Sequence, residues 1–193
     1  MLGGIIFLVL VVIVAFMLVS AYNRLISLKG QTDNAWKQID VQLKRRHDLI
    51  PNLINAAKGA MQFEKETLEA VVAARNSAVN ACASATPATA GQVAAAEGAL
   101  SAALTRFMAV VEAYPDLKAT GNIGQLQEEL SSTENKVAFA RQAYNDTATM
   151  YNITQRQFPT VLVAGLAGAA PAQLWEITDE ADRAVPTVDL TMK

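Results

Sequence analysis

The first stretch of the chain is apolar throughout and lacks the alternation seen further on. Residues 2–22, LGGIIFLVLVVIVAFMLVSAY, contain no charged side chain. About 20 apolar residues, each rising about 1.5 Å, span the ~30 Å hydrocarbon core of a bilayer. A cleaved signal peptide would begin with basic residues and have a shorter apolar core. We therefore predict an uncleaved transmembrane anchor over residues 1–23, which contacts the lipid bilayer through residues 2–22.

After the anchor, apolar positions recur at spacings of three and four residues, as on one face of a helix. Trp36 and Leu43 widen this stripe, so the anchor is expected to continue without a break into an amphipathic helix. Pro51 then removes one helical hydrogen bond. Because Ile50 would be a poor N-cap, we predict a kink in a continuing helix, to about Ala60, rather than a restart. The positions of the stripe are Leu25, Leu28, Thr32, Ala35, Ile39 and Gln42.

Three more helices follow from the same periodicity. They are expected over residues 66–83, 89–114 and 123–158, with a loop over SATPATAG at 84–91 and breaks at Pro115 and Pro159. Long helices joined by short connections pack side by side in antiparallel fashion. The sequence thus predicts an all-α fold, in which a single transmembrane helix continues into a long-helix antiparallel bundle over residues 24–160.

Residues 161–193 form an apolar segment rich in Gly and Ala, followed by a C-terminal tail. Residues 161–170 are apolar but only about half as long as a bilayer span. They can cover the end of the bundle, lie in the membrane interface or pack against a neighbouring subunit. We regard packing on the chain's own bundle and a protein–protein contact as equally open.

Charge and rare residues exclude several function classes. A net charge of -2 gives no footprint for nucleic acid, and the chain has one histidine and one cysteine. These numbers argue against an intramolecular disulfide and against a zinc site, and we expect no cofactor. The acidic run at Asp179, Glu180 and Asp182 lacks the spacing of a calcium loop. Cys82 is expected to be inert, and His47 to be structural or solvated, without catalytic groups around it.

The basic run before Pro51 suggests a packing role. Arg46 falls on the apolar stripe, so we expect it to be partly buried and paired with Glu134 or another carboxylate on the 123–158 helix. Lys44, Arg45 and Arg46 lie near the carbonyls that Pro51 frees, which cations can stabilise. Replacing Arg46 with alanine should destabilise the bundle, whereas the same change at His47 should have a mild effect.

A repeated pair marks the 123–158 helix. Tyr144-Asn145 recurs as Tyr151-Asn152, and Glu134 and Arg141 share the same spacing of seven residues, which places each pair on one stripe. Buried asparagines and ion pairs can fix register between helices. We prefer that interpretation to a ligand site.

The order of motifs resembles that of the LemA family of bacterial membrane proteins. The segments that carry the likeness are AYNRLISL, VQLKRRHDLIPNLINAAKG, YPDLKA, LQEELSSTENKVAFARQAYNDTATMYN, FPT and the Pro-x-Val-Asp-Leu tail. The resemblance implies a single-pass membrane protein with an external N-terminus and a helical-bundle domain. It implies no established enzymatic activity, cofactor or substrate.

Three functions compete. The first is a membrane-anchored, non-catalytic scaffold in the bacterial envelope that self-associates as a homo-oligomer and can contact other membrane proteins. The second is a sensor or adaptor with a pocket lined by Arg75, Arg106, Arg141 or the tyrosines. An enzyme would require convergent titratable groups, which the sequence does not show.

Because Arg24, Lys29 and Lys37 follow the anchor, a cytoplasmic bundle on the inner membrane is favoured, with a periplasmic bundle as the alternative.

Overall fold

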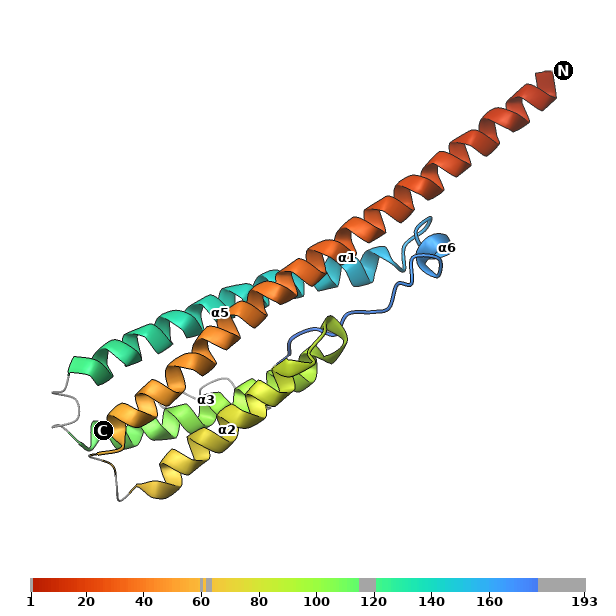
Figure 1. Ribbon diagram of the computed structural model, residues 1–193. Helices are drawn as coiled ribbons and strands as arrows, with labels where there is room; N and C mark the ends of the chain where they lie inside the picture. Colours follow the sequence, from red (N-terminus) through yellow and green to blue (C-terminus); the bar gives the residue numbers. More distant parts are fainter. Residues whose placement is uncertain (1, 60, 62–63, 115–120, 177–193) are drawn as a thin grey trace, which may run out of the picture.

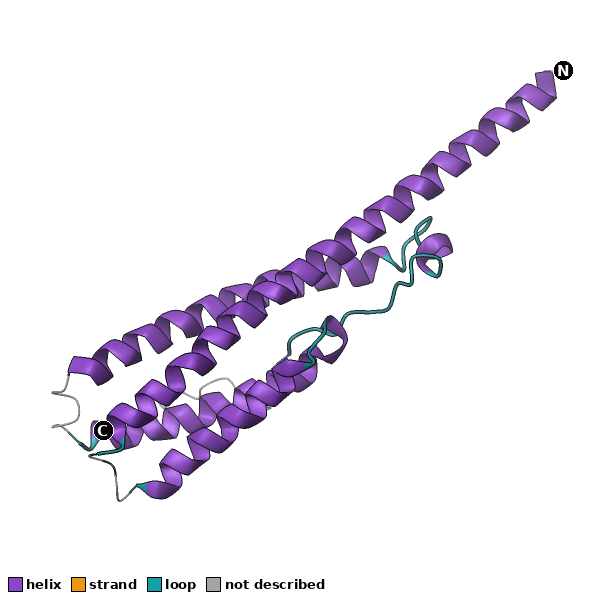
Figure 2. Ribbon diagram, viewed as in Figure 1, coloured by secondary structure: helices purple, strands orange, loops and turns teal. Residues whose placement is uncertain are grey.

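The computed structural model describes residues 2–59, 61, 64–114 and 121–176, and its regular structure in these ranges is entirely helical (Figures 1 and 2). The elements are α1 (Leu2–Ala57), α2 (Lys65–Ala83), the short 3₁₀ turn η1 (Pro87–Thr89), α3 (Ala90–Glu112), α5 (Gly121–Thr154) and α6 (Val161–Ala164). This confirms the all-α fold class and the predicted number of long helices over the described part of the chain.

The long helices alternate in direction. α1 packs mainly along α5 and α2 mainly along α3, and each of these pairs is antiparallel (Figure 1). The first part of α1 projects alone from the end of the bundle where α5 finishes and α6 begins. The architecture is therefore two antiparallel helix pairs, one of which carries a long apolar extension.

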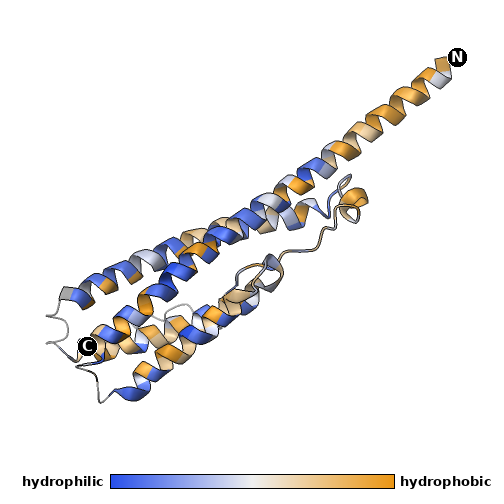
Figure 3. Cartoon of the chain, viewed as in Figure 1, coloured by the Kyte–Doolittle hydropathy of each residue, from blue (hydrophilic) through white to orange (hydrophobic). Residues whose placement is uncertain are grey.

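That extension is long and apolar enough to span a membrane. α1 contains an 18-residue window with a mean hydropathy of 3.2, none of which is buried by the rest of the protein (Figure 3). The stretch Pro87–Glu112 is also long and apolar enough to cross a membrane, with a mean hydropathy of 1.3 over 18 residues. However, 33% of that 18-residue window is buried inside the protein. Side chains of that stretch such as Val93, Leu100 and Phe107 form the bundle core. The exposed apolar part of α1 thus suggests membrane anchoring, whereas α3 is a helix of the bundle.

The apolar stripe of α1 faces the core as predicted. Leu25, Leu28, Thr32, Ala35 and Ile39 are all buried, and Trp36 and Leu43 are buried beside them. Gln42 is only half-buried. The core has two parts along the bundle axis. One contains residues 25–43 of α1 and the other contains residues 50–57.

Pro51 does not end a helix, and α5 ends before it reaches Pro159. α1 runs through Pro51 to Ala57, so the predicted continuous helix is confirmed. α5 ends at Thr154, four residues before the expected end at Phe158, because the chain enters a turn in which the Arg156 and Gln157 amides bond to carbonyls three residues back. The residue before a proline disfavours helical geometry, which is consistent with no helix reaching Pro159. The Pro115 turn and the acidic run at 179–182 lie outside the described residues.

Candidate functional site

Pro51 leaves one backbone carbonyl of α1 without its helical hydrogen-bond donor, and a side chain of α2 binds that carbonyl. Pro51 has no N–H, so the carbonyl of His47 lacks its usual partner within α1. The Arg75 Nε of α2 donates a hydrogen bond to this carbonyl at 3.1 Å. A basic side chain does bind a freed carbonyl, as expected, but it comes from α2 and not from the run at Lys44, Arg45 and Arg46. The proline is thus a docking point for the α2/α3 pair.

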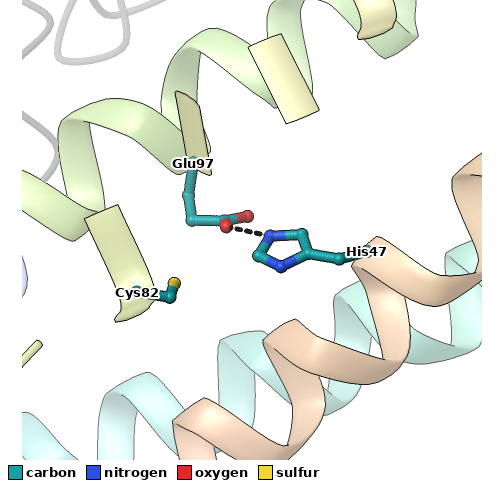
Figure 4. Close-up of side chains that lie close together, drawn as sticks. All are labelled: His47, Cys82 and Glu97. Carbon is teal, nitrogen blue, oxygen red and sulfur yellow. Dashed lines mark hydrogen bonds and ion pairs between the residues drawn. The ribbon is translucent and has the colours of Figure 1, made fainter. Parts of the chain in front are cut away.

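One turn away, three buried side chains, Arg46, His47 and Glu97, form a charged cluster between α1 and α3. Figure 4 shows His47 and Glu97 of this cluster. Glu97 of α3 accepts a hydrogen bond from Arg46 Nη1 through Oε2 at 3.1 Å. Its other oxygen, Oε1, lies 2.6 Å from His47 Nε2. Arg46 Nη2 also donates to the hydroxyl of Ser101 at 2.9 Å. All three members are at most 5% exposed, so the pairing is shielded from water.

The cluster separates the two parts of the core. Residues of α1 before Arg46 and of α3 before Glu97 belong to one apolar group, and residues after them belong to the other. A buried carboxylate without partners would be strongly destabilising, since its hydration is lost. Two donors from consecutive residues of α1 provide that compensation. The cluster therefore fixes where α1 and α3 meet along their length.

The structure corrects two predictions about this stretch. The burial of Arg46 is confirmed, but its expected partner is wrong, because Glu134 is exposed on α5 and Glu97 of α3 binds Arg46 instead. His47 is buried and hydrogen-bonded to Glu97, so it is structural and not solvated. The small effect expected on its replacement is therefore revised to a larger predicted loss of stability. Sequence reasoning missed Glu97, although it lies at helical spacing between Val93, Leu100 and Leu104 on the apolar face of α3.

Cys82 of α2 completes the surroundings of this cluster (Figure 4). Potential ligand atoms of His47, Cys82 and Glu97 all lie within 4.8 Å of one another, so the fold does gather the three residue types that bind zinc. Burial raises the pKa of the Cys82 thiol to about 12, and the charges of Glu97 and Asp40 act in the same direction. The thiol is therefore protonated at neutral pH, which agrees with the expected inert residue.

Charge balance decides what this group of side chains does. A divalent cation here would lie beside the Arg46 guanidinium, which already occupies one oxygen of Glu97. A protonated thiol is a poor nucleophile, and a metal would have to displace its proton as well as disturb the Arg46 ion pair in order to bind. The geometry thus supports ion pairing between helices better than it supports metal binding or thiol chemistry.

A second polar site holds the chain after α6 against α5. Asn152 Nδ2 donates to the carbonyl of Ala172 at 2.7 Å, and the Ala172 amide donates to Asn152 Oδ1 at 2.9 Å. Asn145 makes the same pair of bonds with the backbone of Trp175, at 3.0 and 2.8 Å. Each asparagine side chain thus forms hydrogen bonds with both the backbone N–H and the backbone carbonyl of one residue. We call Asn145, Asn152 and the residues they bind, 172–175, the tail clamp.

Aromatic residues anchor the tail clamp. Trp175 is buried, 6.0 Å from the ring of Trp36, and the guanidinium of Arg141 lies 5.4 Å from the centre of its ring. Tyr144 packs edge-on against Trp36 at 5.2 Å. Its hydroxyl lies 2.6 Å from the carbonyl of Gln173 and 3.2 Å from that of Pro87. Burial raises the pKa of Tyr144 to about 12, with a smaller contribution from Asp33, so the hydroxyl remains a donor.

These contacts correct the interpretation of the repeated pair on α5. Asn145 and Asn152 bind backbone of the tail and do not join one helix to another, while Arg141 stacks on Trp175. Tyr151 is buried like Tyr144, and its hydroxyl interacts with the backbone of Ala170, just before the tail clamp. The stripe was correctly placed on one face, but its partner is an irregular segment, which helix periodicity does not reveal.

Replacing Asn152 with aspartate tests the two-way hydrogen bond. A carboxylate can accept from the Ala172 amide but cannot donate to its carbonyl, so the free energy of unfolding should fall by about 1–3 kcal/mol. Amide hydrogen exchange at Ala172 should become faster. The matched control is Asn135→Asp, an exposed position on the same helix, which should change stability by less than about 0.5 kcal/mol. Equal effects at the two positions would contradict the assigned bonds.

The bundle surface also has two notable grooves. One of about 320 Å³ lies between α1, α3 and α5 and is lined by Arg46, Ser101, Gln127 and Glu134, among others. A second, of about 620 Å³, lies between α1 and α5 beside Val41, Gln42, Lys136 and Phe139. Neither groove is lined by Arg75, Arg106, Arg141 or a tyrosine, the residues expected for a sensor. A smaller groove of about 170 Å³ does include Tyr151 in its lining.

Comparisons with known proteins agree with this architecture. The model of the LemA family matches residues 35–190. Magnetosome protein MamQ 2 of Paramagnetospirillum magneticum is 24% identical over 200 residues, which cover 92% of this chain and 74% of that protein. Protein LemA of Metamycoplasma hominis is 29% identical over 151 residues, which cover 77% of this chain and 66% of that protein. The matched region includes the buried cluster and the tail clamp, and the chain belongs to the LemA family.

Proposed function

We propose that this chain is a membrane-anchored, non-catalytic scaffold of the bacterial envelope that self-associates through the groove between α1 and α5. The observation that carries the proposal is an apolar surface outside the membrane-spanning part. Phe139 is 73% exposed and Val41 is 62% exposed, and both line this groove. Large apolar side chains grouped on a polar helix face are typical of a protein contact.

A polar atom in the same groove supports a partner surface. The Oε1 of Gln42 is buried yet has no hydrogen-bond partner within the described part of the chain. An unsatisfied buried acceptor costs about 1–3 kcal/mol, and rotation of the Gln42 side chain toward a donor on a second copy would remove that cost. Burial of Phe139 in the same contact would add about 1.5–3 kcal/mol of hydrophobic stabilisation.

The proposed location follows from the anchor and its flanking charges. The exposed apolar part of α1 is placed in the inner membrane as a single pass, with the N-terminus outside and the bundle in the cytoplasm. Arg24, Lys29 and Lys37 on the bundle side support this orientation. A periplasmic bundle is the alternative, because long domains can cross a membrane regardless of nearby charge. Other membrane proteins are possible hetero-partners.

The absence of catalysis is also part of the proposal. The buried cluster has the chemistry of an ion pair, and the thiol next to it is protonated. The names of the matched relatives state no reaction. These observations support a structural role. The tail clamp supports it too, because both asparagine side chains bind the backbone of the same chain.

Native mass measurement in mild detergent tests the scaffold. The full-length protein should be larger than a monomer, and Phe139→Glu should shift it to the monomer because a charge would enter the contact. Val72→Glu is the matched control, since Val72 is an exposed apolar residue on α2 and should leave the assembly unchanged. A wild-type protein that is monomeric at all concentrations would contradict the proposal.

A sensor or adaptor is the alternative, and the groove of about 320 Å³ favours it. Arg46 lies in its wall with Ser101 and Glu134, so a small polar ligand could contact the buried cluster directly. Such a ligand would raise the melting temperature of the wild-type protein by mass action. A scaffold that works only through Phe139 predicts no such dependence on small molecules.

A further inference from the structure

The segment around α6 lies where α1 leaves the bundle. α6 packs against α1 at the end of the bundle from which the apolar extension projects (Figure 1). Ala21, at the end of the uncharged stretch of α1, is buried, and Leu18 is half-buried, whereas residues 2–17 are exposed. The bundle therefore begins to cover α1 while that helix is still apolar.

The segment around α6 has two apolar sides. Val163 is buried against the bundle, and Ala164 and Ala167 pack partly against its core. The side chains that point away are larger. Phe158 is 76% exposed, Leu162 is 60% exposed and Leu166 is 82% exposed. Packing on the chain's own bundle thus explains the small residues but leaves the large ones uncovered.

The segment is also free of charge. No Asp, Glu, Lys or Arg occurs between Arg156 and Glu176, and the α6 region is coloured as hydrophobic in Figure 3. A loop exposed to water normally carries polar side chains, and grouped apolar ones mark a contact surface. The apolar part of this stretch, residues 161–170, is only about half as long as a bilayer span, so it can reach the membrane surface but cannot cross the membrane.

We infer that Phe158, Leu162 and Leu166 form a second contact with the lipid bilayer, in the interfacial layer beside the point where α1 enters it. The inference rests on the anchoring helix and is independent of self-association. Apolar side chains placed in this layer are removed from water at about the depth of the headgroups and the first acyl carbons. Tyr22, which is 37% exposed on α1 nearby, is the type of aromatic residue enriched there.

A lipid surface is favoured over a second copy because of position. The anchor fixes α6 at the boundary of the membrane, so its exposed side chains are held next to acyl chains at no further cost in positional freedom. A contact with another bundle would have to form at the same boundary. The bilayer is therefore the partner present whenever α1 is inserted.

Lipid quenching of a single fluorophore tests this inference on the full-length protein in liposomes. Cys82→Ala removes the native thiol, and Leu166→Cys is labelled with an environment-sensitive dye; Leu162→Cys gives a second, independent position. Phosphatidylcholine carrying a spin label near the headgroup is the quencher. Val12→Cys on the apolar part of α1 is the control for insertion, and Val72→Cys on α2 is the control for an exposed site on the bundle, outside the proposed self-association groove.

We expect quenching at Leu166→Cys and Leu162→Cys to be at least about threefold stronger than at Val72→Cys, with a blue-shifted emission. Strong quenching at Val12→Cys together with only the Val72→Cys level at both α6 positions would overturn the inference. A blue-shifted emission at the α6 positions that grows with protein density and is not quenched by the spin-labelled lipid would overturn the inference in favour of a contact with a second copy. Adding Phe139→Glu should leave the α6 signal unchanged, which separates this inference from the scaffold.

Discussion

Replacing Glu97 with alanine is expected to lower the free energy of unfolding by about 3–5 kcal/mol, which is the usual loss when one partner of a buried ion pair is removed. The carboxylate is bound on one oxygen by Arg46 and on the other by His47. Its removal leaves a guanidinium buried without a counter-charge between two apolar groups. Chemical denaturation in detergent micelles, followed by circular dichroism, measures the change.

The matched control is Glu134→Ala, since Glu134 is exposed and was the partner expected from sequence. It should change the free energy of unfolding by less than about 0.5 kcal/mol. Replacing Arg46, His47 and Glu97 together with apolar residues of similar volume should recover most of the loss, because no buried charge then remains. A larger effect at Glu134 than at Glu97 would show that the charge cluster is wrongly assigned.

Replacing Trp175 with alanine is expected to release the tail clamp. Removal of a buried tryptophan costs about 3–5 kcal/mol, and here it also removes the stack with Arg141 and the contact with Trp36. The asparagine bonds alone are too weak to hold a segment that loses its anchor. Amide hydrogen exchange by mass spectrometry should therefore show lost protection over residues 172–175 while α3 stays protected.

Leu174→Ala is the control for this change, because Leu174 is the neighbouring apolar side chain but is only half-buried. Its exchange pattern should remain close to that of the wild type. If Trp175→Ala instead loosened all helices equally, the tail would be part of the global core and not a separately docked segment.

Local periodicity was sufficient to predict the helices and their buried faces. The stripe from Leu25 to Ile39 is buried because a spacing of three and four residues fixes one face of a helix whatever it packs against. The continuous helix through Pro51 was also predictable, since the alternative start at Ile50 lacked a cap. Both are consequences of neighbouring residues only.

Pairings between distant residues were not predictable in the same way. Arg46 and Glu97 are 51 residues apart, and nothing in the spacing of α1 selects α3 over α5 as the source of the carboxylate. The available signal was Glu97 itself, a charge within the apolar face of α3. Such a position requires a buried partner of opposite charge, and Arg46 occupies the equivalent place on α1.

In the tail clamp, the distance between the two asparagines along α5 matches the length of the extended segment that they bind. Asn145 and Asn152 are seven residues apart, or about 10.5 Å on a helix. Three residues of extended chain, as from Ala172 to Trp175, cover about 10 Å. Two asparagines at this interval therefore match the backbone of an extended segment that runs antiparallel to α5. The spacing of the asparagines alone does not distinguish such an extended segment from a second helix packed against α5.

The unbroken length of α1 gives the molecule the mechanics of a lever. A helix of 56 residues is about 84 Å long, of which the bilayer takes about 30 Å. A membrane helix adapts to a thicker or thinner bilayer by changing its tilt. Because α1 is one unbroken helix across this boundary, a tilt of about 10° about Tyr22 would move Pro51, about 44 Å further along the helix, sideways by roughly 7–8 Å. The bundle would swing with the membrane as one body, and local bilayer thickness would set how far it leans.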